Sequence, residues 1–128
     1  MSRARLLDRG GCAVAAVLLA GATLALAGGR SKGNPQAGRK LYNDKCIVCH
    51  KPDGSGGVKL TGNPTPDWRD SARMADPTHD DAALRDCILN GRPASGMPVW
   101  PKQGLKRGQV EDLIAYIRTF SAPPKPKK

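Results

Sequence analysis

The segment DKCIVCHKPD, residues 44–53, holds two of the four cysteines and one of the two histidines in the 128-residue chain. Cys46 and Cys49 are three residues apart, and His50 follows directly. Two thiols at this spacing occur in redox dithiols, in halves of zinc sites and at haem attachment sites. The rest of the chain has to distinguish among these three chemistries.

Zinc and dithiol chemistry both need partners that the sequence lacks. A structural zinc site takes four ligands, and outside the motif the chain offers only Cys87 and His79, with no second paired spacing. A thioredoxin-type dithiol lies in a βαβ setting, whereas no alternating apolar run predicts strands here. His50 would also have no special role beside a dithiol. A non-haem metal site stays an alternative without a complete ligand set.

Haem attachment uses all three residues of the motif together. On a helix, Cys46 and Cys49 lie on one face, about one turn apart, where two thiols can add to the two vinyl groups on one edge of the ring. His50 then presents its imidazole to the iron as an axial ligand. We therefore predict one covalently bound haem c, attached to Cys46 and Cys49, with His50 as a ligand of the iron.

The sequence predicts three helices, over residues 36–48, 78–91 and 108–120. Pro35 suits the first turn of the first helix, Thr78 can cap the second, and Gly91 stands where a helix C-cap glycine is expected. The third helix has the clearest apolar spacing, with Val110, Leu113, Ile114 and Ile117 at i, i+3, i+4 and i+7. Two long loops rich in Gly and Pro separate the helices, and loops of such length in a small domain are expected to wrap something.

Residues 35–120 resemble the class I, single-haem bacterial cytochromes c. The resemblance rests on CIVCH (46–50), the DGSGG turn (53–57), GMPVW (96–100) and VEDLIAYIRTF (110–120). It implies an all-α, small cytochrome c-like fold, with three to four short helices and long loops wrapped around a covalently bound haem. The N- and C-terminal helices are expected to cross, and Gly38 is our candidate for their closest approach, against Tyr116 or Ile117.

The second axial ligand is expected to be Met97. It lies between Gly96 and Pro98 in a loop, where a methionine is poorly placed to fill a core. The resemblance carries it over as the distal ligand, and thioether ligation raises the reduction potential. Met74 and His79 are the rival ligands, although pocket lining explains Met74 better and a polar first-turn position explains His79 better.

The groups around these ligands are harder to predict. We expect His50 to donate its other ring N–H to a backbone carbonyl, with the loop around Asn63 and Pro64 as the candidate. Trp100 and Arg92 are candidates for contact with the haem propionates. Cys87 lies on the apolar side of its helix and is expected to behave as a small buried apolar side chain.

The first 27 residues have the pattern of a secretory signal. Three arginines precede an uncharged apolar run, which ends in Ala-Leu-Ala at Ala27. That run is short for a membrane span, so a retained anchor is the weaker alternative, and Cys12 would leave with the signal. We expect a periplasmic protein with a signal (1–27), a flexible lead (28–34), a cytochrome c domain (35–121) and a basic disordered tail (122–128).

The charge of the exported chain points to its partners. Without the signal, 18 Lys and Arg (21 less Arg3, Arg5 and Arg9) stand against 10 acids (11 less Asp8), a net charge of +8. Export and the scattered positions of the cations argue against nucleic acid, and membrane contact is expected only through the signal or a partner. Acidic surfaces on redox proteins fit better, with lysines such as Lys45, Lys51, Lys59 and Lys102 steering the encounter.

These features predict an electron carrier rather than an enzyme, acting as a monomer or a complex subunit. Its expected role is to transfer single electrons between redox proteins through a haem with His/Met ligation. One alternative is a haem-bearing subunit of a dehydrogenase or oxidase complex. Another is a haem sensor or enzyme with an open distal site, for which the sequence shows no distal His–Arg pair.

Overall fold

Five α-helices and three 3₁₀ turns make up the regular structure of residues 32–122, the part of the chain that the computed structural model describes. The helices are α1 (Pro35–Lys45), α2 (Ile47–His50), α3 (Ser71–Ala75), α4 (Asp81–Asn90) and α5 (Arg107–Ile117), and the turns are η1 (Pro77–His79), η2 (Pro93–Ser95) and η3 (Trp100–Gln103). These residues form no strand, so the all-α fold is confirmed. The expected signal and positions 123–128 of the expected tail lie outside the described residues.

The chain is anchored just before its first helix. The side chain of Asn34 accepts hydrogen bonds from the backbone N–H groups of Gln36 and Ala37, and Pro35 occupies the first turn. The backbone N–H of Asn34 also donates to Asp112 Oδ1 on α5, over 2.7 Å. The end of the segment expected to be a flexible lead is thus tied to the last helix.

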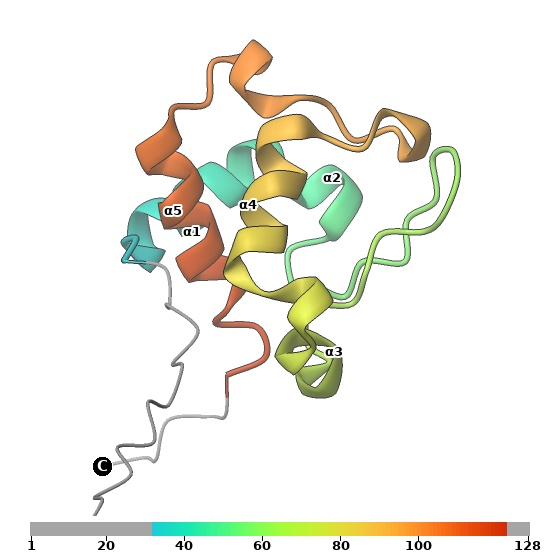
Figure 1. Ribbon diagram of the computed structural model, residues 1–128, viewed down its shortest axis with the longest axis horizontal. Helices are drawn as coiled ribbons and strands as arrows, with labels where there is room; N and C mark the ends of the chain where they lie inside the picture. Colours follow the sequence, from blue (N-terminus) through green and yellow to red (C-terminus); the bar gives the residue numbers. More distant parts are fainter. Residues whose placement is uncertain (1–31, 123–128) are drawn as a thin grey trace, which may run out of the picture.

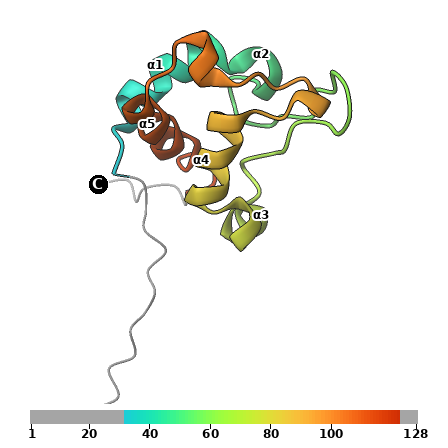
Figure 2. The ribbon, with the colours of Figure 1, turned by 45° about the horizontal axis from the view of Figure 1, so that its top comes forward.

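Helices α1 and α5 pack against each other where they cross, and this crossing lies at one end of the described part of the molecule (Figure 1, Figure 2). Gly38 lies at the crossing as predicted. A Cβ atom there would overlap the carbonyl of Asp112 and stand 2.9 Å from Cβ of Tyr116. The lack of a side chain therefore allows the two backbones to approach. The long loops between α2 and α3 and between α4 and α5 extend to the opposite side in both views.

The first helix does not run through to Val48, so that prediction is wrong. It ends at Lys45, and α2 begins after Cys46, whose φ of −114° interrupts the helix. The hydroxyl of the buried Tyr42 donates to the carbonyls of Lys51, over 2.6 Å, and His50, over 3.2 Å. These bonds hold the end of α2 beside α1, which a single straight helix could not achieve.

The second predicted helix begins later than expected. Asp80, not Thr78, caps α4, because its carboxylate accepts from the backbone N–H of Ala83 over 2.8 Å. Thr78 lies instead in η1. Gly91 ends α4 as predicted, with a φ of +65° that L side chains rarely adopt. Helix α3 was not predicted because five residues are too few to show an apolar period.

The core is built around α5. Its four predicted apolar residues are all buried, together with Leu84 and Ile88 of α4 and Tyr42 of α1. Tyr42 also contacts the rings of Trp68, Tyr116 and Phe120, with centroid distances of 5.9, 5.3 and 5.4 Å. This aromatic cluster connects the two terminal helices to the loop that carries Trp68.

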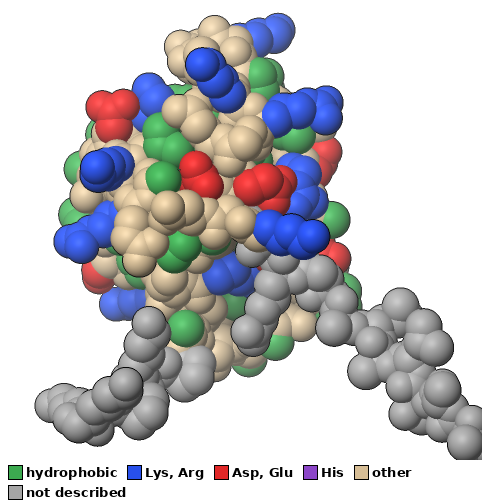
Figure 3. Space-filling model, turned by 90° about the vertical axis from the view of Figure 1, so that its left-hand side faces the viewer, with side chains coloured by type: hydrophobic (Ala, Val, Ile, Leu, Met, Phe, Trp, Pro, Cys, Tyr) green, Lys and Arg blue, Asp and Glu red, His purple; other side chains and the backbone are tan. Residues whose placement is uncertain are grey.

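The surface is mixed in charge. On the face that Figure 3 presents, Lys and Arg side chains are spread over the molecule with acidic groups among them, and they do not gather into a single stripe. Within residues 32–122, no helix is both long enough and apolar enough to cross a membrane.

Candidate functional site

A cavity of about 310 Å³ lies between α2, α4 and the two long loops. Most of its lining is apolar, and the helices α4 and α5 supply its floor through Leu84, Ile88, Leu113 and Ile117. The predicted attachment and ligand residues all line it: Cys46, Cys49, His50 and Met97. The tertiary structure therefore brings together residues that lie about fifty positions apart in the sequence.

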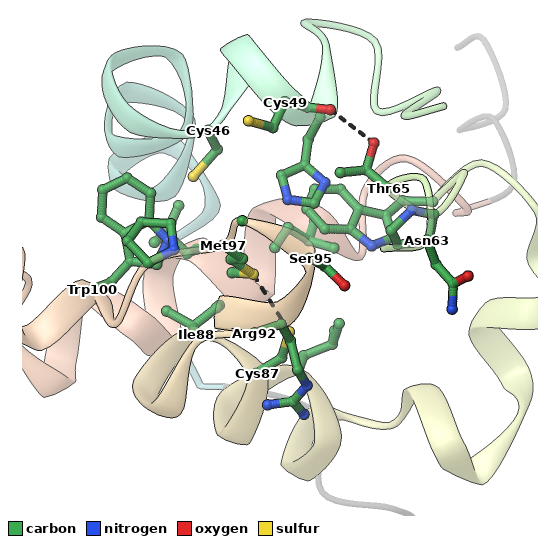
Figure 4. Close-up of a pocket in the computed structure, with 18 of the residues that line it drawn as sticks. Cys46, Cys49, Asn63, Thr65, Cys87, Ile88, Arg92, Ser95, Met97 and Trp100 are labelled. Carbon is green, nitrogen blue, oxygen red and sulfur yellow. Dashed lines mark hydrogen bonds between the residues drawn. The ribbon is translucent and has the colours of Figure 1, made fainter. Parts of the chain in front are cut away.

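Cys46 and Cys49 occupy one wall of the cavity. Cys46 stands at the α1–α2 junction, and its carbonyl accepts from the N–H groups of Cys49, over 3.2 Å, and His50, over 2.9 Å. This single helical turn directs both thiols toward the same space (Figure 4). Burial raises the pKa of the Cys46 thiol to about 12. Both cysteines are free thiols in the structure.

His50 ends α2 and is buried, with 8% of its surface exposed. Burial lowers the pKa of its imidazole to about 4, so the ring is neutral at physiological pH and keeps a lone pair for a metal. Its ring stacks on the indole of Trp68, with a centroid distance of 4.2 Å and an interplanar angle of 12°.

The expected bond from His50 to the carbonyls around Asn63 and Pro64 is not formed. Its Nδ1 is buried and has no hydrogen-bond partner among the described residues. The loop is joined to α2 by another route, because the Thr65 hydroxyl donates to the carbonyl of Cys49 over 2.8 Å and accepts from the N–H of Val58. The loop therefore contacts the motif in two ways, through the hydrogen bond of Thr65 to the Cys49 carbonyl and through the stack of Trp68 on the His50 ring.

Met97 lies on the wall supplied by the loop between α4 and α5. A pair of backbone bonds between Arg92 and Met97, of 3.0 and 3.1 Å, closes this loop around η2. The Met97 sulfur points into the cavity, where the thiol of Cys87 donates to it over 3.6 Å (Figure 4). Cys87 is thus a neighbour of the predicted ligand and not a plain core side chain.

The rival ligands differ in position. Met74 is buried on α3 among the core residues and does not line the cavity. His79 does line it, and its Nδ1 lies 3.0 Å from the hydroxyl of Thr78. Of the two methionines considered, only Met97 therefore has its sulfur in the same cavity as the CIVCH motif.

Trp100 and Arg92 also line the cavity. The guanidinium of Arg92 is already engaged with the carboxylate of Asp86, over 2.9 Å, and the carbonyl of Gly91, over 2.7 Å. Trp100 and Arg92 therefore lie at the cavity, and contact of either one with a haem propionate stays a prediction.

The residues present fit a haem. A pair of thiols on one helical turn, a neutral imidazole with a buried unpartnered nitrogen, and a thioether line one largely apolar cavity. Within residues 32–122, no three His, Cys, Asp or Glu side chains lie close enough together to hold a metal ion by themselves. The zinc alternative therefore gains no support from the described part of the chain.

Comparison with known families agrees with this geometry. Residues 33–117, more than half of the chain, match the family model described as "Cytochrome C oxidase, cbb3-type, subunit III". The chain belongs to this family of c-type cytochromes. Membership implies haem c as the cofactor, and it does not by itself assign the chain to class I.

A curated relative of this c-type cytochrome is the 4-cresol dehydrogenase (hydroxylating) cytochrome c subunit of Pseudomonas putida. The two are 27% identical over 119 residues, which cover 88% of this chain and 91% of the relative. The similarity extends over nearly the whole length of both proteins.

Three residues that hold the site were not predicted: Tyr42, Thr65 and Trp68. Trp68 is the one aromatic residue between the motif and α3, and a single large aromatic side chain in a polar loop could have indicated a contact with the site. Tyr42 and Thr65 act on the motif through its backbone carbonyls. No sequence pattern identifies such bonds, since any nearby hydroxyl can make them.

Proposed function

We propose that this c-type cytochrome is an exported, single-haem electron carrier whose iron is bound by His50 and Met97. The observation that carries the proposal is the single cavity that holds the two thiols and the imidazole of CIVCH on one wall and the Met97 thioether on another. Haem c, when bound there, supplies a couple for one-electron transfer. Its covalent anchors in this proposal are Cys46 and Cys49.

The chain's own groups suit that role. The neutral imidazole of His50 is a metal donor without losing a proton. The apolar floor would lower the polarity around a bound haem, which is one of the means by which proteins tune a haem. With His50 and Met97 both bound to its iron, a haem in this cavity would have no position for a substrate. This is why electron transfer is favoured over a sensor or an enzyme with an open distal site.

Optical spectra of the purified protein test the proposal. We expect a haem spectrum that persists after denaturation and acid extraction, because the ring is covalently attached. Cys46→Ala and Cys49→Ala should lose or weaken that attachment, whereas Cys87→Ala, the matched control for removing a cavity thiol, should retain it. Absence of haem from the unmodified protein would overturn the proposal.

The distal ligand is tested separately. Met97→Ala should abolish the weak long-wavelength band of the oxidised protein, while Met74→Ala, in which a methionine outside the cavity is removed, should keep it. Ready binding of carbon monoxide by the unmodified reduced protein would instead support an open distal site.

The rim of the cavity suits a protein partner. Val48 and Leu60 are large apolar side chains with 81% and 56% of their surface exposed, and Leu60 lines the cavity. Lys59 directly precedes Leu60, Lys45 and Lys51 lie three positions to either side of Val48, and Lys45 also lines the cavity. An apolar centre with basic neighbours fits an acidic docking surface. Electron-transfer rates with such a partner should fall as salt rises, and a salt-independent rate would contradict steering.

Export to the periplasm is part of the proposal and rests on the pattern of residues 1–27. Sequencing the amino terminus of the protein recovered from a periplasmic fraction checks it. A mature chain that begins near Gly28 is expected, and one that retains Met1 would contradict cleavage.

The second candidate is a haem-bearing subunit of a dehydrogenase complex. The observation that favours it is the full-length similarity to a cytochrome subunit of 4-cresol dehydrogenase. Size-exclusion chromatography of the protein from its native source distinguishes the two roles. A free carrier elutes at the size of the single chain, whereas a subunit elutes together with a dehydrogenase partner.

A further inference from the structure

We propose that Trp68 is a positioning residue that fixes the rotation of the His50 imidazole about its Cβ–Cγ bond, and so the direction of the ring plane that faces the iron. The inference rests on the proposed function, since it assigns the role of a neighbour to the predicted proximal ligand. It goes beyond that function by naming what holds the ligand.

The contact between the two rings is close and nearly parallel. Their centroids are 4.2 Å apart with an interplanar angle of 12°, and both side chains are buried, with 8% of His50 and 6% of Trp68 exposed. A parallel indole on one face leaves the imidazole little freedom to rotate about its Cβ–Cγ bond. Rotation would drive the ring edge into the indole.

The usual restraint on such a ring is missing. A metal-bound histidine ordinarily donates its second ring N–H to an oxygen, and this bond sets the orientation of the ring. Here Nδ1 of His50 is buried without a partner among the residues that the structure describes. The stack on Trp68 is the contact of the ring that can take over this task.

Trp68 is itself held in place from several sides. Its backbone N–H donates to the carbonyl of Gly54 over 2.9 Å. Its indole contacts Tyr42, with a centroid distance of 5.9 Å, and Phe120, at 6.4 Å with an interplanar angle of 23°. The core formed by α1 and the end of α5 therefore fixes the indole, and the indole fixes the imidazole.

Trp68→Leu and Trp68→Phe form the decisive pair of variants in the haem-loaded protein. Leucine removes the flat surface, whereas phenylalanine retains one. The readouts are the proton NMR shifts of the haem methyl groups in the oxidised protein, which depend on the direction of the axial imidazole plane, and the reduction potential. Tyr116→Leu is the matched control, because it removes a ring of the same aromatic cluster that packs on Tyr42 and Phe120 rather than on Trp68 and does not line the cavity.

We expect Trp68→Leu to change the pattern of methyl shifts and to move the potential, and Trp68→Phe to restore most of both. Tyr116→Leu should lower stability while leaving the shift pattern close to that of the unmodified protein. The inference is overturned if Trp68→Leu keeps the original pattern, or if Tyr116→Leu alters it to the same degree, since the effect would then be general loosening of the core.

A measurement on the unmodified protein covers the case in which Trp68→Leu fails to fold. In the reduced, diamagnetic protein, nuclear Overhauser contacts between the ring protons of His50 and Trp68 are expected. Their absence in a haem-loaded protein overturns this inference alone. Failure of the chain to bind haem at all would overturn the proposed function, so the two outcomes are distinguishable.

Discussion

The thiol of Cys87 donates a hydrogen bond to the sulfur of Met97, with 3.6 Å between Sγ and Sδ. Cys87 comes from α4 and Met97 from the loop that follows it, so the contact closes the distal side of the cavity (Figure 4). Burial raises the pKa of the Cys87 thiol, which keeps it protonated and able to donate. A residue expected to be an ordinary apolar side chain thus contacts the predicted distal ligand.

Cys87→Ala should weaken the hold on Met97, because it removes the one donor that the structure gives to the thioether. The long-wavelength band of the oxidised protein should then disappear at a lower temperature than in the unmodified protein. Cys87→Ser, which keeps a donor at the same place, should fall between the two. Thermal scans of that band check the order, and an unchanged midpoint in Cys87→Ala would contradict it.

Gly38→Ala should destabilise the protein by about 3 kcal/mol, the upper part of the range for overpacking. The new methyl group would overlap the carbonyl of Asp112 and force α1 away from α5. Gly108→Ala is the matched control, since that helical glycine has no atom within 4 Å of an added Cβ. Better helix propensity should stabilise this variant by about 0.5–1 kcal/mol. Denaturant unfolding of both variants measures the difference, and equal stabilities would contradict close packing at the crossing.

Arg118→Ala should cost about 2–3 kcal/mol, because it leaves several partly buried acceptors without their donor. The guanidinium of Arg118 donates to Asp81 Oδ1 and to the carbonyls of Met74 and His79, over 2.7, 2.7 and 2.6 Å. It therefore joins the end of α5 to α3, η1 and α4.

Arg118→Lys should recover only part of this stability, since an ammonium group lacks the planar fork that reaches three acceptors. Arg69→Ala is the control, because its pairs with Asp53 and Asp67 are exposed and such pairs contribute little. Thermal unfolding of the three variants is the measurement. A loss in Arg69→Ala as large as that in Arg118→Ala would contradict the distinction.

Asp67 should titrate well below an ordinary carboxyl group. Hydrogen bonds from the side chain and backbone of Arg69 lower its pKa from 3.8 to about 2. A pKa lower in the folded state means that this carboxylate supports folding above about pH 4, and that the contribution is lost as the pH falls toward 2. NMR titration of Asp67 measures the pKa directly.

Arg69→Gln should return the pKa of Asp67 toward 3.8, because the charged donor is removed. Asp53 is the internal control, since hydrogen bonds from Ser55 are the main cause of its lowered pKa and Arg69 contributes less. Its titration should therefore shift less in the same variant. An Asp67 that titrates near 3.8 in the unmodified protein would show that the exposed pair is open in solution.

The helical fold and half of the site could be predicted from local patterns. The spacing of Val110, Leu113, Ile114 and Ile117 predicts the buried face of α5, and all four are buried. CIVCH predicts where two thiols and an imidazole meet, because residues three and four positions apart lie on the same face of a helical turn. Helix starts were less predictable: Asp80 and Thr78 are both good caps, and only the packing of η1 beside α3 and α4 decides between them.

The class of fold, the family, the attachment motif and the apolar face of the last helix followed from the sequence. The motif and the apolar face depend on residues within one or two turns of each other, whereas the family rests on several short motifs spread over residues 46–120. The tertiary structure decided which distant side chains share the cavity. It set Met97 rather than Met74 opposite the motif, Cys87 beside that sulfur and Trp68 against His50. Such pairs depend on how the loops return to the helices, and that path follows from the packing of the whole core around α1 and α5.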